Sequence, residues 1–287
     1  MTRIIYVNGQ YKHYDDAGVH AEDRGFQFGD AVYEVCEVRH GCLVDEARHM
    51  ARLSRSLNEL CITAPMSDRA WQRVLRETVR RNRVRNGLVY LQVSRGAGPR
   101  NFLFSDVETQ PTVVCLARSV DPAQQQQAAE NGIRVITHEE TRWARRDIKT
   151  VMLLPASLAK EKAKSKGAQE VWFVNQNGMV LEGGSSNAWI INDKGELLTR
   201  PVDTSILSGV ARLTLIEVAE RFQLQFIERE FSIDEALEAQ EAFITSATAL
   251  VMPVVQVNDQ IIGEGRPGPI TRKLREAFHS VAEMNPV

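Results

Sequence analysis

A lysine stands among apolar residues in the stretch RRDIKTVMLL, which covers residues 145–154. Lys149 follows Ile148 and precedes the apolar run VMLL by one residue. A lysine is almost never fully buried without a partner, so one interpretation is a surface amine whose stem lies along apolar side chains. The other is a desolvated amine with a lowered pKa, which acts as a nucleophile and forms a Schiff base. Lys149 alone leaves both interpretations open.

An acidic side chain ends a hydrophobic strand in the stretch LEGGSSN, residues 181–187. Glu182 precedes two glycines, which let the backbone approach a ligand closely, and three short polar side chains that could line a pocket. Taken by itself, the stretch favours a tight turn with a solvent-facing glutamate. A functional role for Glu182 therefore depends on what the rest of the chain supplies.

Two further stretches are rich in small residues and hydroxyl groups. SILSGVAR, residues 205–212, leads into a helix through Ser208 and Gly209. The N–H groups at a helix start bind anions, and a glycine admits an anion close to them. The alternative is that Ser208 only caps the helix. TSATAL, residues 245–250, lies between apolar strands and is also suited to an anion.

An amine, a carboxylate and a backbone anion site are together what pyridoxal 5′-phosphate requires of a protein. Lys149 would form the Schiff base, and Glu182 would keep the pyridine nitrogen protonated so that the ring withdraws electrons. The helix start near Gly209 would hold the phosphate. The combination therefore points to this cofactor, although each stretch is a weak signal alone.

The composition is that of a globular protein without a strongly charged partner. The 287 residues include 25% charged and 43% hydrophobic residues, and the formal net charge of −2 gives no basic field for nucleic acid or membrane. No apolar run approaches the ~20 residues that span a bilayer, and the start lacks the apolar core of a secretory signal. The four cysteines form no CxxC pair and the histidines no metal motif. We therefore expect a cytoplasmic protein without a metal.

The first 120 residues alternate strands with helices. The expected elements are strands at 3–9, 87–96 and 112–120, a hairpin at 31–45 that turns near His40 and Gly41, and helices at 46–60 and 68–84. Strands with helices beside them predict a small N-terminal α/β domain over residues 1–120. The polar stretch DPAQQQQAAENG, residues 121–132, predicts an interdomain linker.

Residues 133–287 are expected to form a larger, cofactor-binding C-terminal domain. The expected elements are a strand at 133–140, a helix at 154–167, two hairpins within 170–200, a helix at 207–222, three strands within 240–263 and a closing helix at 269–284. The hairpins turn at Asn177–Gly178 and near Lys194–Gly195. Many strands with few crossover helices predict a curled, barrel-like domain, so the whole chain is expected to have a mixed α/β fold.

Seven stretches in this order resemble the class IV (fold type IV) pyridoxal-phosphate aminotransferases, among which the D-amino acid transaminases are the most similar. They are EDRGFQFGDAVYEV (22–35), RHMARLSRS (48–56), YLQVSRGAGPR (90–100), RWARRDIK (142–149), LEGGSSN (181–187), ILSGVAR (206–212) and SATALVMPV (246–254). The resemblance implies a small N-terminal α/β domain and a larger pseudo-barrel domain. It also implies transfer of an amino group from a D-amino acid, such as D-alanine, to a 2-oxo acid by a ping-pong mechanism, in a homodimer with shared active sites.

The resemblance also assigns roles to individual residues. It implies that Lys149 is the Schiff-base lysine and proton carrier, and that Glu182 pairs with the pyridine nitrogen. Tyr33 would face the substrate carboxylate, and Arg100, from the neighbouring subunit, would bind it. Without the resemblance, Arg52 and Arg100 would be interpreted as surface arginines and Tyr33 as a half-buried strand residue. The implied contacts to the cofactor's phosphate and ring are Arg52, Leu207, Gly209, Val210, Ala211, Ser246 and Ala247.

The sequence departs from the family pattern at two places. The D-amino acid transaminases carry a histidine two residues after the carboxylate-binding arginine, and here that position is Phe102. One hydrogen bond to a charged group contributes ~1.5–3 kcal/mol, so its loss would weaken carboxylate binding, re-route it through another arginine or widen the range of amine donors. In the phosphate site, Ala211 and Ala247 replace threonines, which leaves the backbone donors in place.

Other activities remain as alternatives. The same scaffold serves branched-chain L-amino acid transaminases, (R)-amine transaminases and 4-amino-4-deoxychorismate lyases. A protein that binds a metabolite or anion without catalysis is the alternative from another class. Because anion binding alone requires neither Lys149 nor Glu182, their presence together favours an enzyme.

Overall fold

The computed structural model describes residues 3–104 and 109–287. Contacts between Cα atoms divide the chain into two compact units. Unit 1 comprises Met1–Asp121, Ile148–Met152 and Glu283–Val287, and unit 2 comprises Pro122–Asp147 and Leu153–Ala282. Each unit is therefore assembled from segments that are separated in the sequence.

This division differs from the expected one in three segments. The expected linker at 121–132 forms a helix, α4 (Pro122–Asn131), which belongs to unit 2 and buries Ala129 in its core. Its alanines and glutamines are good helix formers, which explains why a polar stretch becomes regular. The segments 148–152 and 283–287, expected in the C-terminal domain, belong to unit 1, because both hydrogen-bond to its strands.

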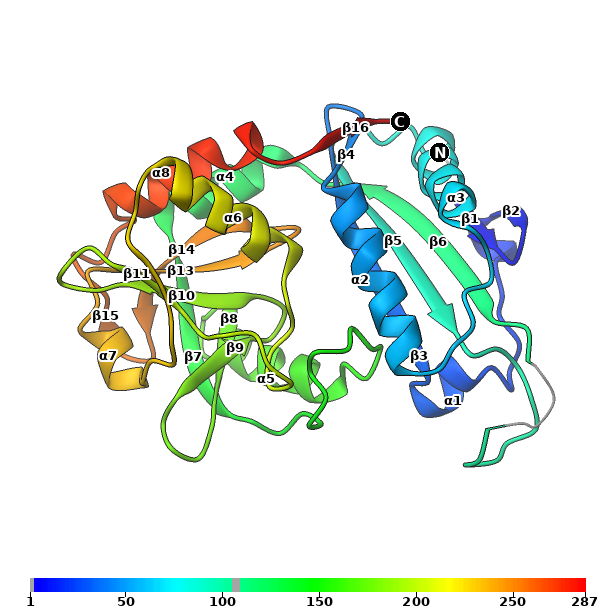
Figure 1. The fold of residues 1–287 in the computed structure, drawn as a ribbon, viewed down its shortest axis with the longest axis horizontal. Coiled ribbons are helices and arrows are strands. Elements are labelled where there is room, and N and C mark those ends of the chain that lie inside the picture. Colours follow the sequence, from blue (N-terminus) through cyan, green and yellow to red (C-terminus); the bar gives the residue numbers. More distant parts are fainter. Residues whose placement is uncertain (1–2, 105–108) are drawn as a thin grey trace. The chain divides into compact units, whose positions relative to one another are not determined.

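Unit 1 is built on an antiparallel sheet, in which the described strands follow the order β16-β4-β3-β5-β6-β1-β2 (Figure 1). The strands are β1 (Ile4–Val7), β2 (Gln10–His13), β3 (Ala31–Arg39), β4 (Cys42–Val44), β5 (Gly87–Ser94), β6 (Thr112–Ser119) and β16 (Met284–Pro286). The helices are η1 (Tyr14–Asp16), α1 (Arg24–Phe28), α2 (Glu46–Glu59) and α3 (Asp68–Arg81). The predicted hairpin, which turns at His40 and Gly41, is β3–β4.

The two faces of this sheet differ in burial. Along β3, Val32, Glu34 and Cys36 are buried, whereas Tyr33 and Val35 between them are half-buried. Successive side chains of a strand point to opposite faces. The helix α2 packs on β3, and α3 packs on β6 and β1, on the face to which Glu34 points. Tyr33 therefore lies on the opposite face.

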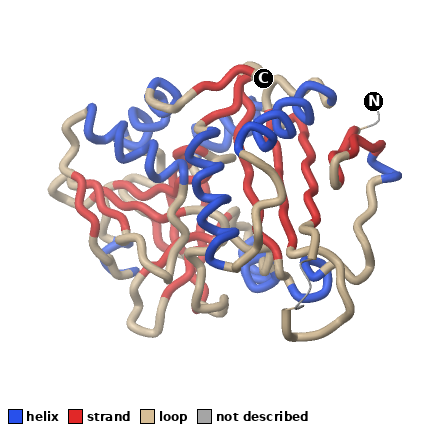
Figure 2. The backbone as a smooth tube through the Cα atoms, turned by 45° about the vertical axis from the view of Figure 1, so that its right-hand side comes forward, coloured by secondary structure: helices blue, strands red, loops and turns tan. Residues whose placement is uncertain are grey.

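Unit 2 is built on a mixed sheet with the strand order β12-β11-β10-β13-β14-β7-β8-β9 in the described chain, and with β15 beside β14 (Figure 2). Its strands are β7 (Ile133–Glu139), β8 (Glu170–Val174), β9 (Val180–Gly183), β10 (Asn187–Ile191), β11 (Leu197–Thr199), β12 (Phe226–Glu228), β13 (Glu241–Ser246), β14 (Leu250–Val257) and β15 (Gln260–Ile261). Beside α4, its helices are α5 (Leu154–Ser165), α6 (Val210–Arg221), α7 (Ile233–Leu237), α8 (Pro269–Ala277) and η2 (Phe278–Ser280).

Apolar side chains pack on both faces of the unit 2 sheet. Ala188 and Ile190 of β10 belong to one apolar cluster, and Trp189 and Ile191 belong to another. The second cluster also contains Leu215 of α6, so α6 covers this face. The packing fixes the start of α6 relative to β10.

The hairpins predicted in unit 2 are present, with turns at Asn177–Gly178 and Lys194–Gly195. The closing helix is shorter than expected. It ends at Ala277 and is followed by η2 and by β16, which pairs with β4 of unit 1. In the described part of the chain, no helix has both the length and the apolar character that crossing a membrane requires.

Candidate active site

The segment that carries Lys149 runs beside β3 in unit 1. The amide of Tyr33 donates to the carbonyl of Lys149 at 3.0 Å, and the amide of Val151 donates to the carbonyl of Ala31 at 3.1 Å. The amide of Lys149 itself donates to Ser56 Oγ of α2 at 3.4 Å. These bonds hold the backbone of Lys149 in register with β3 and explain why the segment belongs to unit 1.

The amine of Lys149 lies over the ring of Tyr33. Lys149 Nζ is 4.2 Å from the ring centroid, a distance at which the face of an aromatic ring attracts a cation. The Tyr33 ring stacks on Tyr90 with 5.6 Å between centroids, and the Tyr90 hydroxyl donates to Gln92 Oε1 at 2.6 Å. Lys149 is half-buried, and burial raises the pKa of Tyr90. The amine therefore stands beside two tyrosines on the half-buried face of the sheet.

A buried ionic cluster lies under α2 on the other face of β3. Glu34 is 1% exposed and accepts hydrogen bonds from Arg52 Nε and Nη2, both at 2.8 Å, and from His49 Nδ1 at 2.7 Å. Burial by itself raises the pKa of Glu34, but Arg52 and His49 bring that pKa down to about 2. Because an ionised carboxylate only accepts hydrogen bonds, His49 Nδ1 carries the proton of this bond.

Arg52 is not the surface arginine that its helix position suggests. Its side chain is 10% exposed and pairs with Glu34. The predicted contact of Arg52 with a phosphate stays a prediction. In this cluster, two of its guanidinium nitrogens donate to one carboxylate.

Arg100 and Phe102 lie on the chain segment that follows β5. Both are exposed, and both gather around Phe28 of α1. The guanidinium carbon of Arg100 lies 5.4 Å from the Phe28 ring centroid, and the Phe102 ring meets Phe28 edge-on at 5.8 Å. The predicted carboxylate-binding arginine and the position of the missing histidine are therefore neighbours in unit 1.

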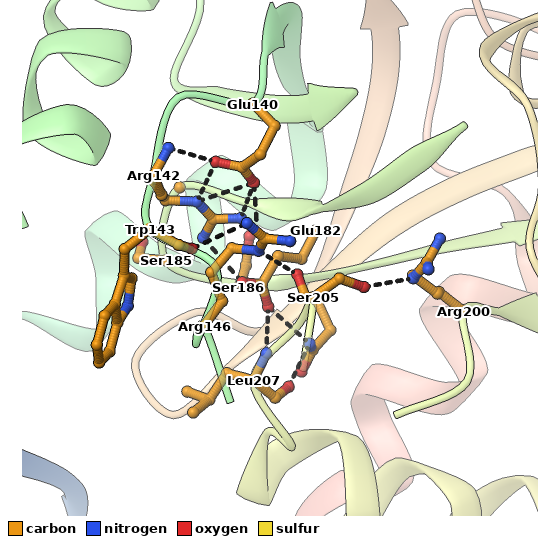
Figure 3. Close-up of polar contacts among 12 residues, drawn as sticks. Glu140, Arg142, Trp143, Arg146, Glu182, Ser185, Ser186, Arg200, Ser205 and Leu207 are labelled. Atoms are coloured by element: carbon orange, nitrogen blue, oxygen red, sulfur yellow. Dashed lines mark hydrogen bonds and ion pairs between the residues drawn. The ribbon is translucent and has the colours of Figure 1, made fainter. Parts of the chain in front are cut away.

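Glu182 forms the centre of a polar network in unit 2 (Figure 3). It is 4% exposed, so the solvent-facing interpretation is wrong. Arg142 Nη1 donates to Oε1 at 2.8 Å, the Leu207 amide donates to Oε2 at 2.9 Å, and Asn187 Nδ2 donates to Oε2 at 3.3 Å. Burial raises the pKa of Glu182, and Arg142 and the Leu207 amide counteract part of the effect.

The helix α6 begins at the glycine that the sequence singles out. The N-cap is Gly209 rather than Ser208, and Val210 and Ala211 form the first turn. The first N–H groups of a helix have no partner within it. A Cβ atom at Gly209 would lie 2.1 Å from Asn187 Oδ1, so only glycine fits there. Asn187 also donates to the Leu207 carbonyl at 2.9 Å, which joins the helix start to the site of Glu182.

The second predicted anion stretch lies at the end of β13. Ser246 is the last residue of that strand, and its Oγ accepts a hydrogen bond from the Ala249 amide at 3.0 Å. Ala247 follows in the turn that leads to β14. Before it, Thr245 Oγ1 accepts a hydrogen bond from Trp189 Nε1 at 2.9 Å. These bonds fix the turn that carries the predicted donors.

The residues of unit 2 fit a phosphorylated heterocycle with a cationic nitrogen. A buried carboxylate whose pKa is raised by burial gains from a cationic partner, and Glu182 is such a group. The start of the 12-residue helix α6, with a glycine N-cap, offers N–H donors for a phosphate. In residues 3–104 and 109–287, no group of three or more His, Cys, Asp or Glu side chains is arranged to hold a metal ion.

Comparison with known families agrees with this chemistry. Residues 31–257 match the family model of amino-transferase class IV. The chain belongs to the class IV aminotransferases. The family expected from the seven stretches is thereby confirmed.

Relatives of this class IV aminotransferase align over nearly the whole chain. It is 35% identical over 283 residues to a D-alanine aminotransferase of Staphylococcus aureus (strain MSSA476), with 99% of each chain covered. It is 37% identical over 276 residues to one of Bacillus licheniformis, with 96% of each covered. Among solved structures, a T.th. branched-chain amino acid aminotransferase with pyridoxamine 5′-phosphate matches with a TM-score of 0.89 at 23% identity, over 98% of this chain and 94% of that one. The mixed α/β fold is confirmed.

Sequence reasoning singled out fewer polar residues than the structure gathers around the two groups. It gave no role to Glu34 and His49 in unit 1 or to Arg142 and Asn187 in unit 2. Two signals were available. Glu34 is a charged residue at a buried position of an alternating strand, and Asn187 closes the quoted stretch LEGGSSN.

Proposed function

We propose that the protein is a pyridoxal-5′-phosphate-dependent aminotransferase that moves the amino group of a D-amino acid, such as D-alanine, to a 2-oxo acid. The structural observation that carries the proposal is the site of Glu182, a buried carboxylate held by three donors. The donor class is supported by the identity of 35% to 37% with D-alanine aminotransferases over nearly the full chain.

Two side chains carry the chemistry in this proposal. When bound, pyridoxal 5′-phosphate supplies a ring that accepts the electron pair released from the Cα–H bond of an amino acid. Lys149 holds the cofactor covalently through Nζ, gives up this bond to the incoming amine, and then moves the proton between Cα and C4′. Glu182 holds the ring nitrogen in its protonated form. The second half of the ping-pong cycle uses the same groups in reverse order with a 2-oxo acid.

Backbone and side-chain donors would hold the phosphate and the ring. The guanidinium of Arg52 matches phosphate geometry, and the helix dipole of α6 favours an anion at its start. Leu207 would pack against the ring, because its amide already bonds the carboxylate that the ring nitrogen requires. The proposed phosphate ligands are Arg52 and the backbone of Gly209, Val210, Ala211, Ser246 and Ala247.

The substrate end of the site depends on unit 1 and on a second subunit. Tyr33, on the half-buried face of the sheet beside Lys149, would face the substrate carboxylate. Arg100 would bind that carboxylate in the neighbouring subunit of a homodimer. Both Arg100 and Phe102 are exposed in the single chain, as residues that complete a neighbouring site would be.

A half-reaction screen tests the proposal. Purified protein loaded with pyridoxal 5′-phosphate is mixed with D-alanine, L-leucine or (R)-1-phenylethylamine, and the visible absorption of the bound cofactor is followed. We expect D-alanine to remove the band fastest. Borohydride reduction followed by peptide mapping should place a pyridoxyl group on Lys149, and failure to trap any adduct would favour a non-catalytic binding protein.

One observation favours the sibling activities as the second candidate. Phe102 is 81% exposed and apolar where the D-amino acid transaminases have a histidine, so the carboxylate site lacks one donor. If L-leucine or (R)-1-phenylethylamine reacts faster than D-alanine, the D-amino acid assignment is wrong. Pyruvate release from aminodeoxychorismate without a 2-oxo acid would identify a lyase. In the variant Phe102→His, a restored donor should lower the KM for D-alanine about tenfold.

A further inference from the structure

Arg142 lies between two carboxylates in unit 2. Arg142 Nη1 donates to Glu182 Oε1 at 2.8 Å, while Nη2 donates to Glu140 Oε2 at 2.7 Å and Nε donates to Glu140 Oε1 at 3.0 Å. Figure 3 shows the guanidinium between the two acidic side chains. One planar cation therefore serves two anions through different nitrogens.

The orientation of this guanidinium is fixed on several sides. The backbone amide of Arg142 donates to Glu140 Oε1 at 2.7 Å, so the short segment after β7 folds back on its own side chain. The guanidinium carbon lies 4.1 Å from the ring centroid of Phe173 on β8, a distance typical of stacking. The side chain is 12% exposed. With Glu140 and Phe173 in these places, Nη1 can point only toward Glu182.

Glu182 needs this cation to remain a carboxylate. It is buried, and its other two donors are the uncharged Leu207 amide and Asn187. Burial raises the pKa of Glu182, and Glu140 raises it further, whereas Arg142 is the charged group that lowers it. A protonated carboxyl would have no charge to offer a cationic ring nitrogen.

We infer that Arg142 is a positioning residue for the aminotransferase reaction: it keeps Glu182 ionised and aims it, and Glu140 in turn orients Arg142. The inference rests on the proposed function. It assigns Glu140, which would otherwise only repel Glu182, the role of a second anchor for the shared arginine.

The other charged groups around this site bond elsewhere. Arg146 donates to the Ser205 carbonyl at 2.7 Å and lies 3.6 Å from Glu140. On the side of the glycine turn, Lys160 pairs with Glu170 at 3.2 Å. Neither pair includes Glu182, so a change of Arg142 should reach Glu182 directly.

The first test uses the cofactor-free protein. Infrared difference spectra over a pH series detect the stretching band of a protonated carboxyl in Arg142→Met, in Arg142→Met with Glu182→Gln, and in the control Arg145→Met. Arg145 is a neighbouring arginine that pairs with Asp147 instead. We expect the band to persist to higher pH in Arg142→Met than in the wild type. It should be absent from the double variant and unchanged in Arg145→Met.

The second test measures affinity for pyridoxal 5′-phosphate by equilibrium dialysis. We expect binding to weaken about ten- to a hundredfold in Arg142→Met, the range that loss of a charge-assisted hydrogen bond gives. Arg142→Lys keeps the charge and so preserves the fold, but an ammonium cannot bond both carboxylates in this geometry, so the loss should be intermediate. Once Glu182→Gln is present, Arg142→Met should have little further effect.

The outcomes separate this inference from the proposed function. If the wild type binds the cofactor and transfers amino groups while Arg142→Lys and Arg142→Met match Arg145→Met in both tests, the positioning role is wrong and the function stands. If the wild type forms no adduct at Lys149, the proposed function fails by itself. A shifted carboxyl band in the cofactor-free Arg142→Met variant would then still support control of Glu182 by Arg142.

Discussion

Each unit contains a buried glutamate that is bonded to an arginine, and the two glutamates behave differently. Glu34 in unit 1 has a pKa of about 2, whereas the pKa of Glu182 in unit 2 is raised. Both are almost fully buried. Burial alone therefore does not decide the charge of a carboxyl group in this protein.

The partners of the two glutamates explain the difference. Arg52 donates to both oxygens of Glu34, and His49 adds a third bond. Glu182 receives only one bond from its arginine, because Arg142 also serves Glu140. The positive charge is concentrated on one carboxylate in unit 1 and divided between two in unit 2. Glu34 is therefore an internal counterion, and Glu182 is a carboxylate with capacity for another cation.

The largest effect should come from the amine of unit 1. Lys149→Ala should lower amino-group transfer by about a thousandfold or more, since it removes both the covalent link and the proton carrier. Stopped-flow half-reactions with D-alanine measure the loss. Lys194→Ala, a change of an exposed lysine in a hairpin turn, should be silent. Activity in Lys149→Ala near the wild-type level would remove unit 1 from the chemistry.

Glu34→Gln should damage stability more than any change at Glu182. An amide has a single acceptor oxygen and no charge, so it cannot replace a carboxylate that accepts three bonds from Arg52 and His49. We expect a loss of about 3 kcal/mol in the free energy of unfolding at neutral pH. Denaturant titration of the cofactor-free protein measures this loss.

The pH dependence of that loss has a definite sign. The pKa of Glu34 falls from 4.5 to about 2 on folding, so its contribution is full above pH 4.5 and disappears as the pH falls toward 2. The stability difference between wild type and Glu34→Gln should therefore shrink across that window. A difference that stays constant would show that the ionised carboxylate is not its source.

Glu182→Gln should show the opposite pattern, with a loss of activity at little cost in stability. Amino-group transfer should fall by about a hundredfold, a loss typical for removal of one electrostatic partner from an active site. The free energy of unfolding should change by less than about 1 kcal/mol, because Arg142 keeps Glu140 as its counterion. Kinetics and denaturant titration on the same preparation measure both quantities.

The acid titration of this variant should also run the other way. The pKa of Glu182 is raised in the folded protein, so its ionised form lowers stability above that pKa, and protonation relieves the cost as the pH falls toward 4.5. Relative to the wild type, Glu182→Gln should be most stable at neutral pH and lose this advantage on acidification. The same slope for both glutamates would contradict the comparison.

The smallest effect is expected at the start of α6. In Gly209→Ala, the new methyl group would displace Asn187, which bonds both Glu182 and the Leu207 carbonyl. We expect affinity for pyridoxal 5′-phosphate to fall about tenfold with the fold retained. Gly18→Ala, where a Cβ atom meets nothing within 4 Å, is the matched control. Equal affinities would show that the site of Glu182 tolerates movement of Asn187.

Local patterns predicted the elements and part of the site. The turn at His40–Gly41 was predicted because its residues accept positive φ angles. Lys149 and Glu182 could be singled out because each is a charged residue beside apolar or glycine neighbours. The family resemblance, rather than the residue pattern, supplied the role of Tyr33.

The partners of the buried glutamates could not be predicted in this way. Glu34 and Arg52 are 18 residues apart and lie on different elements, and Arg142 and Glu182 are 40 residues apart. Only the tertiary fold brings such groups together. The segment 148–152 was placed in the wrong part of the chain for the same reason, since its hydrogen bonds to β3 are non-local.

The pairing of β16 with β4 has a consequence for biosynthesis. On the ribosome, β4 emerges early, yet the strand that covers its outer edge is made last. Until then, the nascent sheet presents an open edge to other polypeptides, which is a known route to aggregation. A chaperone that shields nascent β4, or slow translation near the 3′ end of the message, would therefore affect the yield of native protein without touching its catalytic groups.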